Sequence, residues 1–169
     1  VGVARNTAEL GCAVGLGGQI GFIELGQLPA ALKSERFDAV AHAATVYGRR
    51  GVSDCELLDA NVAFPLRVLD ACRSRNNHCR FLNTDSFFNK PGNSSGYMPA
   101  YVQSKRHLWE WLQRADRGVV NLRVEHVYGP RDRPPKFVPW LLHELAAGKS
   151  VRLTAGEHFR DFVHVVDVA

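Results

Sequence analysis

The stretch Phe37-Asp-Ala-Val-Ala-His-Ala-Ala44 decides the fold. It is a short apolar run that ends in small residues, which is typical of a buried strand in a parallel sheet. Residues 54–75 follow with apolar side chains three and four apart, so this segment is predicted to be a helix with one face on a sheet. The apolar stripe consists of Leu57, Leu58, Val62, Leu66, Leu69 and Cys72.

Strand and helix patterns continue to alternate along the chain. Further strands are predicted at residues 80–83, 119–123, 151–154 and 162–165, further helices from Pro99 to near Gly118 and at 137–147, and a loop at 89–99. The predicted fold class is therefore α/β, a Rossmann-like doubly wound parallel sheet with helices on both faces. Ligands of such sheets bind at the carboxyl ends of the strands, so residues 42–44, 84–86 and 127–129 should gather at one edge.

Tyr101 and Lys105 lie four residues apart in a segment that is predicted to be helical. Positions i and i+4 share one helix face, about 5–6 Å apart at Cβ. An ammonium beside a phenol favours the phenolate, so Lys105 is expected to lower the pKa of Tyr101. Such a phenol suits proton exchange in alcohol/ketone chemistry. Taken alone, the pattern fits a solvated surface pair as well as a catalytic one.

The composition fits one globular domain with a substantial core. Of the 169 residues, 46% are hydrophobic and 22% are charged, and no apolar run approaches the ~18 residues of a membrane span. The net charge is +4, but the basic residues are scattered and no nucleic-acid-binding motif accompanies them. The charge is therefore interpreted as attraction for phosphorylated small molecules, with no nucleic-acid or membrane partner.

The cysteines are Cys12, Cys55, Cys72 and Cys79. None forms a C-x-x-C pair, and zinc sites usually have closely paired ligands, so no metal site is predicted. Reduced and mostly buried thiols are expected, as in a cytoplasmic protein.

Six motifs occur in the order of a known family. They are His42-Ala-Ala44, Asn61 at the start of a helix, Thr84-Asp-Ser86, Tyr101…Lys105, Leu122-Arg123…Tyr128-Gly-Pro130 and Arg160-Asp-Phe-Val-His164…Asp167. From about Phe37 to its end, the chain resembles the extended short-chain dehydrogenase/reductase family, which includes the epimerases, dehydratases and reductases of nucleotide sugars. Segments 42–49, 83–90 and 125–130 resemble the branch that reduces the 4-keto group of a CDP-linked dideoxyhexose.

This resemblance implies an NAD(P)-dependent oxidoreductase that reduces the 4-keto group of a CDP-linked deoxyhexose. A nucleotide-sugar 4-epimerase or dehydratase would use the same residues, and a non-catalytic binding relative of the family is a further alternative. The implied cofactor is NADP or NAD, and the implied partner is a nucleotide-sugar substrate. Family analogy also suggests a homodimer.

The resemblance assigns three catalytic residues. Tyr101 would exchange a proton with the sugar oxygen, while Lys105 would lower the pKa of Tyr101 and hydrogen-bond the nicotinamide ribose. Ser86 matches the family Ser/Thr that hydrogen-bonds the reacting oxygen of the substrate. Thr84 is the rival for that role, because residues 89–90 depart from the family's usual Tyr-Gly and loosen the alignment.

Cofactor-binding residues follow from the same matches. His42, Ala43, Ala44 and Thr45 match the strand end that passes under the cofactor, where small side chains allow close backbone approach, and Asn61 matches an asparagine near the cofactor. The structural alternatives are a satisfied, half-buried histidine at position 42 and a helix cap at position 61.

Two residues are matched to the substrate. His126 stands where many relatives carry an asparagine near the nucleotide-sugar phosphates. Arg160 matches the family arginine that binds the nucleotide pyrophosphate, a suitable partner for a dianion. A surface salt bridge is the structural alternative for Arg160.

Gly15, Gly18 and Gly21 have the spacing of a dinucleotide-binding turn. Too few residues separate Gly21 from Asp38 for the helix and two strands that the family places there, so these glycines are interpreted as loop. Residues 1–5 then end the family's second strand, and the first strand and glycine loop are missing. Arg5 would meet a ribose 2′-phosphate, which favours NADP.

The expected organisation follows from this interpretation. Residues 1–130 form a partial Rossmann-type NAD(P)-binding domain, and residues 131–169 begin a substrate-binding lobe with a returning strand. Relatives continue past that point, and the 169 residues alone are expected to bind the cofactor weakly.

Overall fold

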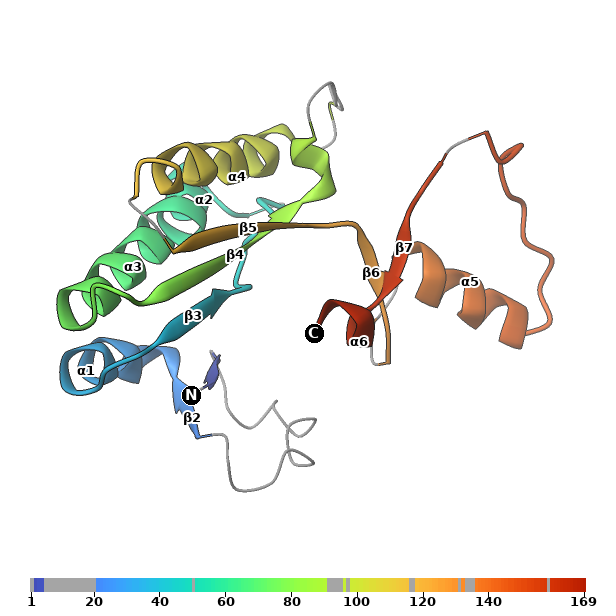
Figure 1. Cartoon of the computed structure of the whole chain (residues 1–169). Coiled ribbons are helices and arrows are strands. Elements are labelled where there is room, and N and C mark those ends of the chain that lie inside the picture. The colour runs from blue at the N-terminus through green and yellow to red at the C-terminus, as the bar shows by residue number, and fades with distance from the viewer. Residues whose placement is uncertain are drawn as a thin grey trace.

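Parallel strands form the framework of the chain (Figure 1). The computed structural model describes residues 2–4, 21–49, 51–90, 96, 98–115, 118–130, 132, 136–157 and 159–169. In these residues β1 (Gly2–Ala4) pairs with β2 (Phe22–Glu24), β4 (Arg80–Ser86) lies between β3 (Ala39–His42) and β5 (Val119–Val124), and β6 (His126–Tyr128) pairs with β7 (Phe162–His164). All of these pairings are parallel, which confirms the predicted α/β class.

Helices alternate with the strands. They are η3 (Leu25–Gln27), α1 (Leu28–Ser34), α2 (Asp54–Leu58), η4 (Asp59–Ala63), α3 (Phe64–Arg75), η5 (Phe87–Asn89), α4 (Pro99–Leu112), α5 (Phe137–Ala146) and α6 (Val165–Val168). Figure 1 shows α2, α3 and α4 together on one side of the β3-β4-β5 sheet. β6, β7, α5 and α6 lie beyond the carboxyl end of β5.

Residues 54–75 are helical, as predicted, but they do not form one regular helix. Ser53 caps the start: its Oγ accepts the Glu56 N–H at 3.2 Å, and Glu56 Oε2 accepts the Ser53 N–H at 2.8 Å. The turn η4 then has π-helical geometry and ends two residues before Pro65. Proline has no N–H to donate to the preceding turn, so the wider turn absorbs this residue without ending the helix.

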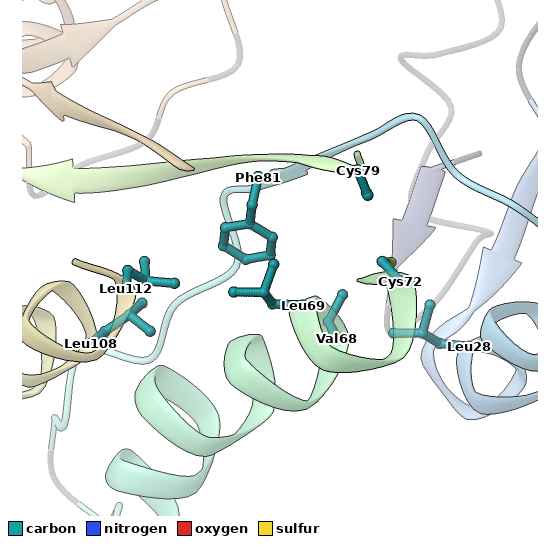
Figure 2. Packing of buried hydrophobic residues seen from close by; sticks show 8 residues of the cluster. All are labelled: Leu28, Val68, Leu69, Cys72, Cys79, Phe81, Leu108 and Leu112. Carbon is teal, nitrogen blue, oxygen red and sulfur yellow. The ribbon is translucent and has the colours of Figure 1, made fainter. Parts of the chain in front are cut away.

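The core lies between β4 and the helices (Figure 2). The fully buried ring of Phe81 points from β4 toward Leu69 of α3, with Leu108 and Leu112 of α4 beside it. Leu28, Val68, Cys72 and Cys79 complete the cluster. Burying each large apolar side chain contributes about 1.5–3 kcal/mol. This packing therefore fixes β4 against α4, the two elements that carry the catalytic candidates.

Several element boundaries differ from those predicted. β4 continues beyond residue 83 to Ser86, and α4 ends at Leu112 rather than near Gly118. The predicted strand at 151–154 is wrong, because these residues have no regular structure and Leu153 is exposed. Leu58, expected in the apolar stripe, is exposed because α2 ends at this residue and the wider turn η4 changes the helix face.

The N-terminal region was only partly predicted. β1 confirms a strand within residues 1–5, whereas β2, α1 and, later in the chain, β6 were missed. Gly21 has no regular structure, as expected for a loop, but Arg5, Gly15 and Gly18 lie outside the described residues.

The described part of the chain contains no helix that is both long and apolar enough to cross a bilayer. It also contains no group of three or more His, Cys, Asp or Glu side chains that could hold a metal ion. Cys72 and Cys79 are buried as expected, but Cys55 is exposed, and Cys12 lies outside these residues.

Candidate functional site

The helix α4 brings Tyr101, Ser104 and Lys105 onto one buried face. Tyr101 is 6% exposed and Lys105 is 2% exposed, so they are not the solvated surface pair that the spacing alone allowed. Pro99 opens the helix, because its fixed φ suits the first turn and its missing N–H is not needed there. The predicted shared face for positions 101 and 105 is confirmed.

The end of β4 meets this helix face. Lys105 Nζ donates to the carbonyl oxygen of Thr84 at 3.0 Å, and the Ser86 side chain lies close enough to the Tyr101 hydroxyl to lower its pKa. The Thr84 hydroxyl is turned away, since its Oγ1 donates to the carbonyl oxygen of His42 at 3.0 Å. The geometry therefore favours Ser86 over Thr84 as the hydroxyl beside Tyr101.

The pKa of Tyr101 differs from the sequence prediction. Burial raises this pKa above its ordinary value, Tyr47 and Asp85 raise it further, and hydrogen bonds to Ser86 and Thr45 lower it. The Tyr47 ring contributes to the burial, with its centroid 5.1 Å from that of the Tyr101 ring. The phenol is therefore held in its protonated form, the form that can donate a proton.

Lys105, which was expected to lower the pKa of Tyr101, is not among the groups that shift it. Its ammonium donates to the Thr84 carbonyl. Burial lowers the pKa of Lys105 itself, and the negative charge of Asp85 opposes that effect. The sequence pattern placed the two side chains on one helix face, as the structure has them. It did not give the direction of the Tyr101 pKa shift, because that direction depends on burial, which the spacing does not reveal.

Asn61 joins the loop after β3 to the helix α4. Its Oδ1 accepts the Val46 N–H at 2.8 Å and the Thr45 hydroxyl at 3.3 Å. Its Nδ2 donates to the Val46 carbonyl at 2.7 Å and to Ser104 Oγ at 3.0 Å. Both donors and both acceptor positions of the amide are thus in use. Asn61 is not a helix cap, and its contact with a cofactor stays a prediction.

The residues at the end of β3 divide into two kinds. Ala43 and Ala44 are exposed. His42 is buried, with its ring stacked 6.0 Å from that of Phe81, and its Nε2 has no hydrogen-bond partner among the described residues. Burial, and then the charge of Lys105, lowers the pKa of His42 to about 4. His42 is therefore a neutral, buried histidine rather than a half-buried one with satisfied nitrogens.

A cavity of about 870 Å³ adjoins this strand end. Its lining includes residues 42–46 together with apolar side chains of β2, α1 and α3. The volume is that of a small-molecule site, but the lining does not include Tyr101, Ser86 or Lys105. The cavity thus borders the predicted cofactor segment without enclosing the catalytic candidates.

The predicted substrate residues lie together in the region of β6 and β7. The His126 ring is stacked 4.0 Å from the Phe87 ring, and its Nδ1 is buried without a partner among the described residues. Burial, and then the charge of Arg160, lowers the pKa of His126. Arg160 is exposed and donates to the carbonyl of its neighbour Phe159. The ion pairs among the described residues do not include Arg160, so the surface salt bridge named as its structural alternative is not seen there.

Sequence patterns missed the polar residues behind the site. Asp85, Asn89 and Asn121 form a hydrogen-bonded cluster next to Ser86. The signal for them was polar residues inside a strand that should be apolar, at positions 83, 85 and 121. Arg5, predicted to bind the cofactor, lies outside the described residues.

Comparison with known proteins gives one family match. The model of the NAD dependent epimerase/dehydratase family matches residues 19–169. The chain is 42% identical over 135 residues to the CDP-abequose synthase of Salmonella typhimurium. This match covers 76% of this chain and 44% of that protein. It therefore spans about half the length of the curated relatives it matches.

Solved structures of nucleotide-sugar enzymes have the same fold. The ADP-L-glycero-D-manno-heptose-6-epimerase of Helicobacter pylori superposes with a TM-score of 0.73 at 25% identity, over 90% of this chain and 55% of that one. UDP-glucuronic acid 4-epimerase from Bacillus cereus, solved with UDP-glucuronic acid and NAD, gives a TM-score of 0.66 at 21% identity. That match covers 99% of this chain and 60% of the epimerase.

Proposed function

This chain belongs to the NAD-dependent epimerase/dehydratase family, and on that premise we propose that it reduces the 4-keto group of a CDP-linked deoxyhexose. The observation that carries the proposal is the buried phenol of Tyr101, which lies beside Ser86 and one helical turn from the ammonium of Lys105. The identity to CDP-abequose synthase supports the nucleotide and the sugar class.

Tyr101, Ser86 and Lys105 have different roles in the proposed reduction. Tyr101 donates its hydroxyl proton to the oxygen of the 4-keto group as that oxygen gains negative charge. The raised pKa of Tyr101 supports this direction, because the donor must be protonated before reaction. Ser86, whose side chain lies beside the Tyr101 hydroxyl, orients the same oxygen. Lys105, which lies one helical turn from Tyr101, would hydrogen-bond the ribose of a bound nicotinamide cofactor.

The residues at the strand ends fit an NAD(P) cofactor. Ala43 and Ala44 are small and exposed after β3, so a flat ring system can approach the backbone there. Ala43, Ala44 and Thr45 would hold the cofactor from β3, and Lys105 from α4. When bound, the nicotinamide supplies the hydride that reduces the ketone. The choice of NADP over NAD is proposed on Arg5 alone.

His126 and Arg160 are proposed to bind the nucleotide diphosphate. Arg160 is exposed, and its charge lowers the pKa of His126, so the two groups act on the same region. The Nδ1 of His126 is buried without a partner among the described residues, so a substrate oxygen could bond it only where the ring turns toward the substrate. An arginine suits a pyrophosphate, because its planar N–H groups bind two oxygens at once.

A 4-epimerase is the second candidate, because superposable structures include 4-epimerases. The two reactions are separated by supplying NADPH with a CDP-linked 4-keto-3,6-dideoxyhexose and following nicotinamide absorbance. The reductase oxidises one NADPH for each sugar reduced. An epimerase consumes no net cofactor, so a changed sugar with no loss of NADPH would exclude the reductase.

A further inference from the structure

The rings of Phe137 and Phe162 form an exposed aromatic pair. Their centroids are 5.9 Å apart, and the rings are tilted by 30°. Phe137 opens α5 and is 45% exposed, while Phe162 opens β7 and is 44% exposed. Figure 1 shows α5 next to β7, beyond the carboxyl end of β5. Phenylalanine side chains are usually buried, so two half-exposed rings in contact mark a surface that a ligand can cover.

Neighbouring rings hold this pair in place. The Phe162 ring lies 5.5 Å from the ring of His126, its partner in the register of β6 and β7. The His126 ring in turn stacks 4.0 Å from Phe87, and the Phe137 ring lies 6.2 Å from Trp140 on the same helix. The two exposed rings are therefore already ordered, and a ligand that stacks on them does not have to immobilise them.

An arginine lies beside the pair. Arg160 is exposed and stands two residues before Phe162, so their Cα atoms are at most about 7 Å apart. The His126 N–H donates to the carbonyl oxygen of the intervening Asp161 at 3.1 Å, which fixes this segment to β6. A guanidinium binds phosphate oxygens in pairs. A flat apolar surface next to an arginine matches a nucleoside diphosphate, in which a ribose separates the flat base from the phosphates.

The face of an exposed ring has to be open to receive a base. The Trp111 ring on α4 is also exposed, but the Arg114 guanidinium lies over it, 4.8 Å from the centroid. A cation in that place already uses the ring face. The cation–π pairs of the described residues include neither Phe137 nor Phe162. These two rings are therefore the better stacking surface.

We propose that Phe137 and Phe162 form the stacking surface for the base of the nucleotide whose diphosphate Arg160 binds. The ligand class, a nucleotide sugar, rests on the proposed function. Stacking on an aromatic face is tolerant of base identity, because every base has a π-face. The surface therefore contributes affinity for the nucleoside, and it does not select cytosine over uracil.

The test is the affinity for CDP, UDP and inorganic pyrophosphate, measured by isothermal titration. Phe162→Leu keeps an apolar side chain but removes the aromatic face, so CDP and UDP should both bind roughly fivefold or more weakly. Pyrophosphate has no base, and its affinity should not change. Trp111→Leu, at the exposed ring on α4, is the matched control and should leave all three affinities unchanged.

Three results would overturn the proposal: no CDP binding by the unchanged protein, equal CDP affinity in Phe162→Leu, or an equal loss of pyrophosphate affinity. A second measurement needs no variant. Protons over an aromatic ring face are shielded, so the cytosine H5 and H6 NMR signals of CDP should move upfield as CDP binds to the unchanged protein. Signals that stay in place during binding would refute the stacking.

Both readouts are independent of turnover. If the keto-sugar causes no NADPH oxidation while Phe162→Leu still weakens CDP binding selectively, the proposed function fails and the stacking surface stands. If NADPH is oxidised and CDP binds equally well to Phe162→Leu, the stacking surface fails and the proposed function stands.

Discussion

Lys105 Nζ donates a hydrogen bond to the carbonyl oxygen of Thr84 at 3.0 Å, which joins the middle of α4 to the end of β4. The ammonium is almost completely buried, and the core around Phe81 holds the two elements together independently of it. The contact therefore serves to place a charge, and stability and activity should respond differently to its loss.

Replacing Lys105 by methionine should separate its effect on stability from its effect on activity. Lys105→Met keeps the apolar stem and removes a buried charge, so the free energy of unfolding should change by less than about 1.5 kcal/mol. Reduction of the keto-sugar should slow by roughly 100-fold or more. Urea unfolding and steady-state kinetics give the two values, and Lys33→Met, on the exposed side of α1, is the matched control with neither effect. If Lys105→Met lost activity only because the protein unfolded, the expected separation of stability from activity would be contradicted.

Asn61 should matter for stability. Asn61→Ala removes four hydrogen bonds and leaves the Val46 N–H and carbonyl without their partner, so the free energy of unfolding should fall by about 2–4 kcal/mol. The exposed Asn77 offers a control, because Asn77→Ala should stay within about 0.5 kcal/mol of the unchanged protein in urea unfolding. Equal effects of the two changes would show that the contacts of Asn61 contribute nothing.

His42 should make the fold sensitive to acid. Its folded pKa is about 4 against an ordinary value of 6.5, so the unfolded chain binds the proton more readily. The resulting stability is present above about pH 6.5 and is lost as the pH falls toward 4, by about 3 kcal/mol in total. Urea unfolding at several pH values measures it. His42→Phe should flatten this dependence, and His78→Gln, at an exposed site, should not; a slope that survives in His42→Phe would assign it to another group.

Arg160 should act on substrate binding more than on the chemical step. Arg160→Ala should lose a charge-assisted contact to a phosphate of the substrate. This loss should raise KM for the nucleotide sugar by roughly tenfold or more and leave kcat nearly unchanged. Arg152→Ala, at another exposed arginine, is the control. Equal KM values for the two variants would remove Arg160 from the substrate site.

Spacing in the sequence was sufficient to predict the long elements and the shared face of Tyr101 and Lys105. Apolar runs such as 37–44 and the periodic stripe of α3 depend on local pattern alone. The short strands β2 and β6 were missed because each has three residues and is defined by its pairing with a distant strand. The failed strand at 151–154 has the right residues but no strand to pair with among those described.

The sequence predicted where the site lies, but it did not predict the direction of the Tyr101 pKa shift. Burial of Tyr101 sets the direction of its pKa, and burial is a property of the packed fold rather than of the Tyr-x-x-x-Lys spacing. The choice between Thr84 and Ser86 also needed the structure, since it depends on which hydroxyl is turned toward β3. Asp85 went unnoticed because its partners Asn89 and Asn121 lie in other elements.

The central claim is that Tyr101 donates the proton in a reduction of a nucleotide-linked ketone. The most direct measurement is the single-turnover rate of NADPH oxidation with a CDP-linked 4-keto-3,6-dideoxyhexose, in the unchanged protein and in Tyr101→Phe. The phenyl ring keeps the packing against Tyr47 and removes only the hydroxyl. We expect the rate to fall by roughly 100-fold or more with cofactor binding retained. An unchanged rate in Tyr101→Phe would contradict the account.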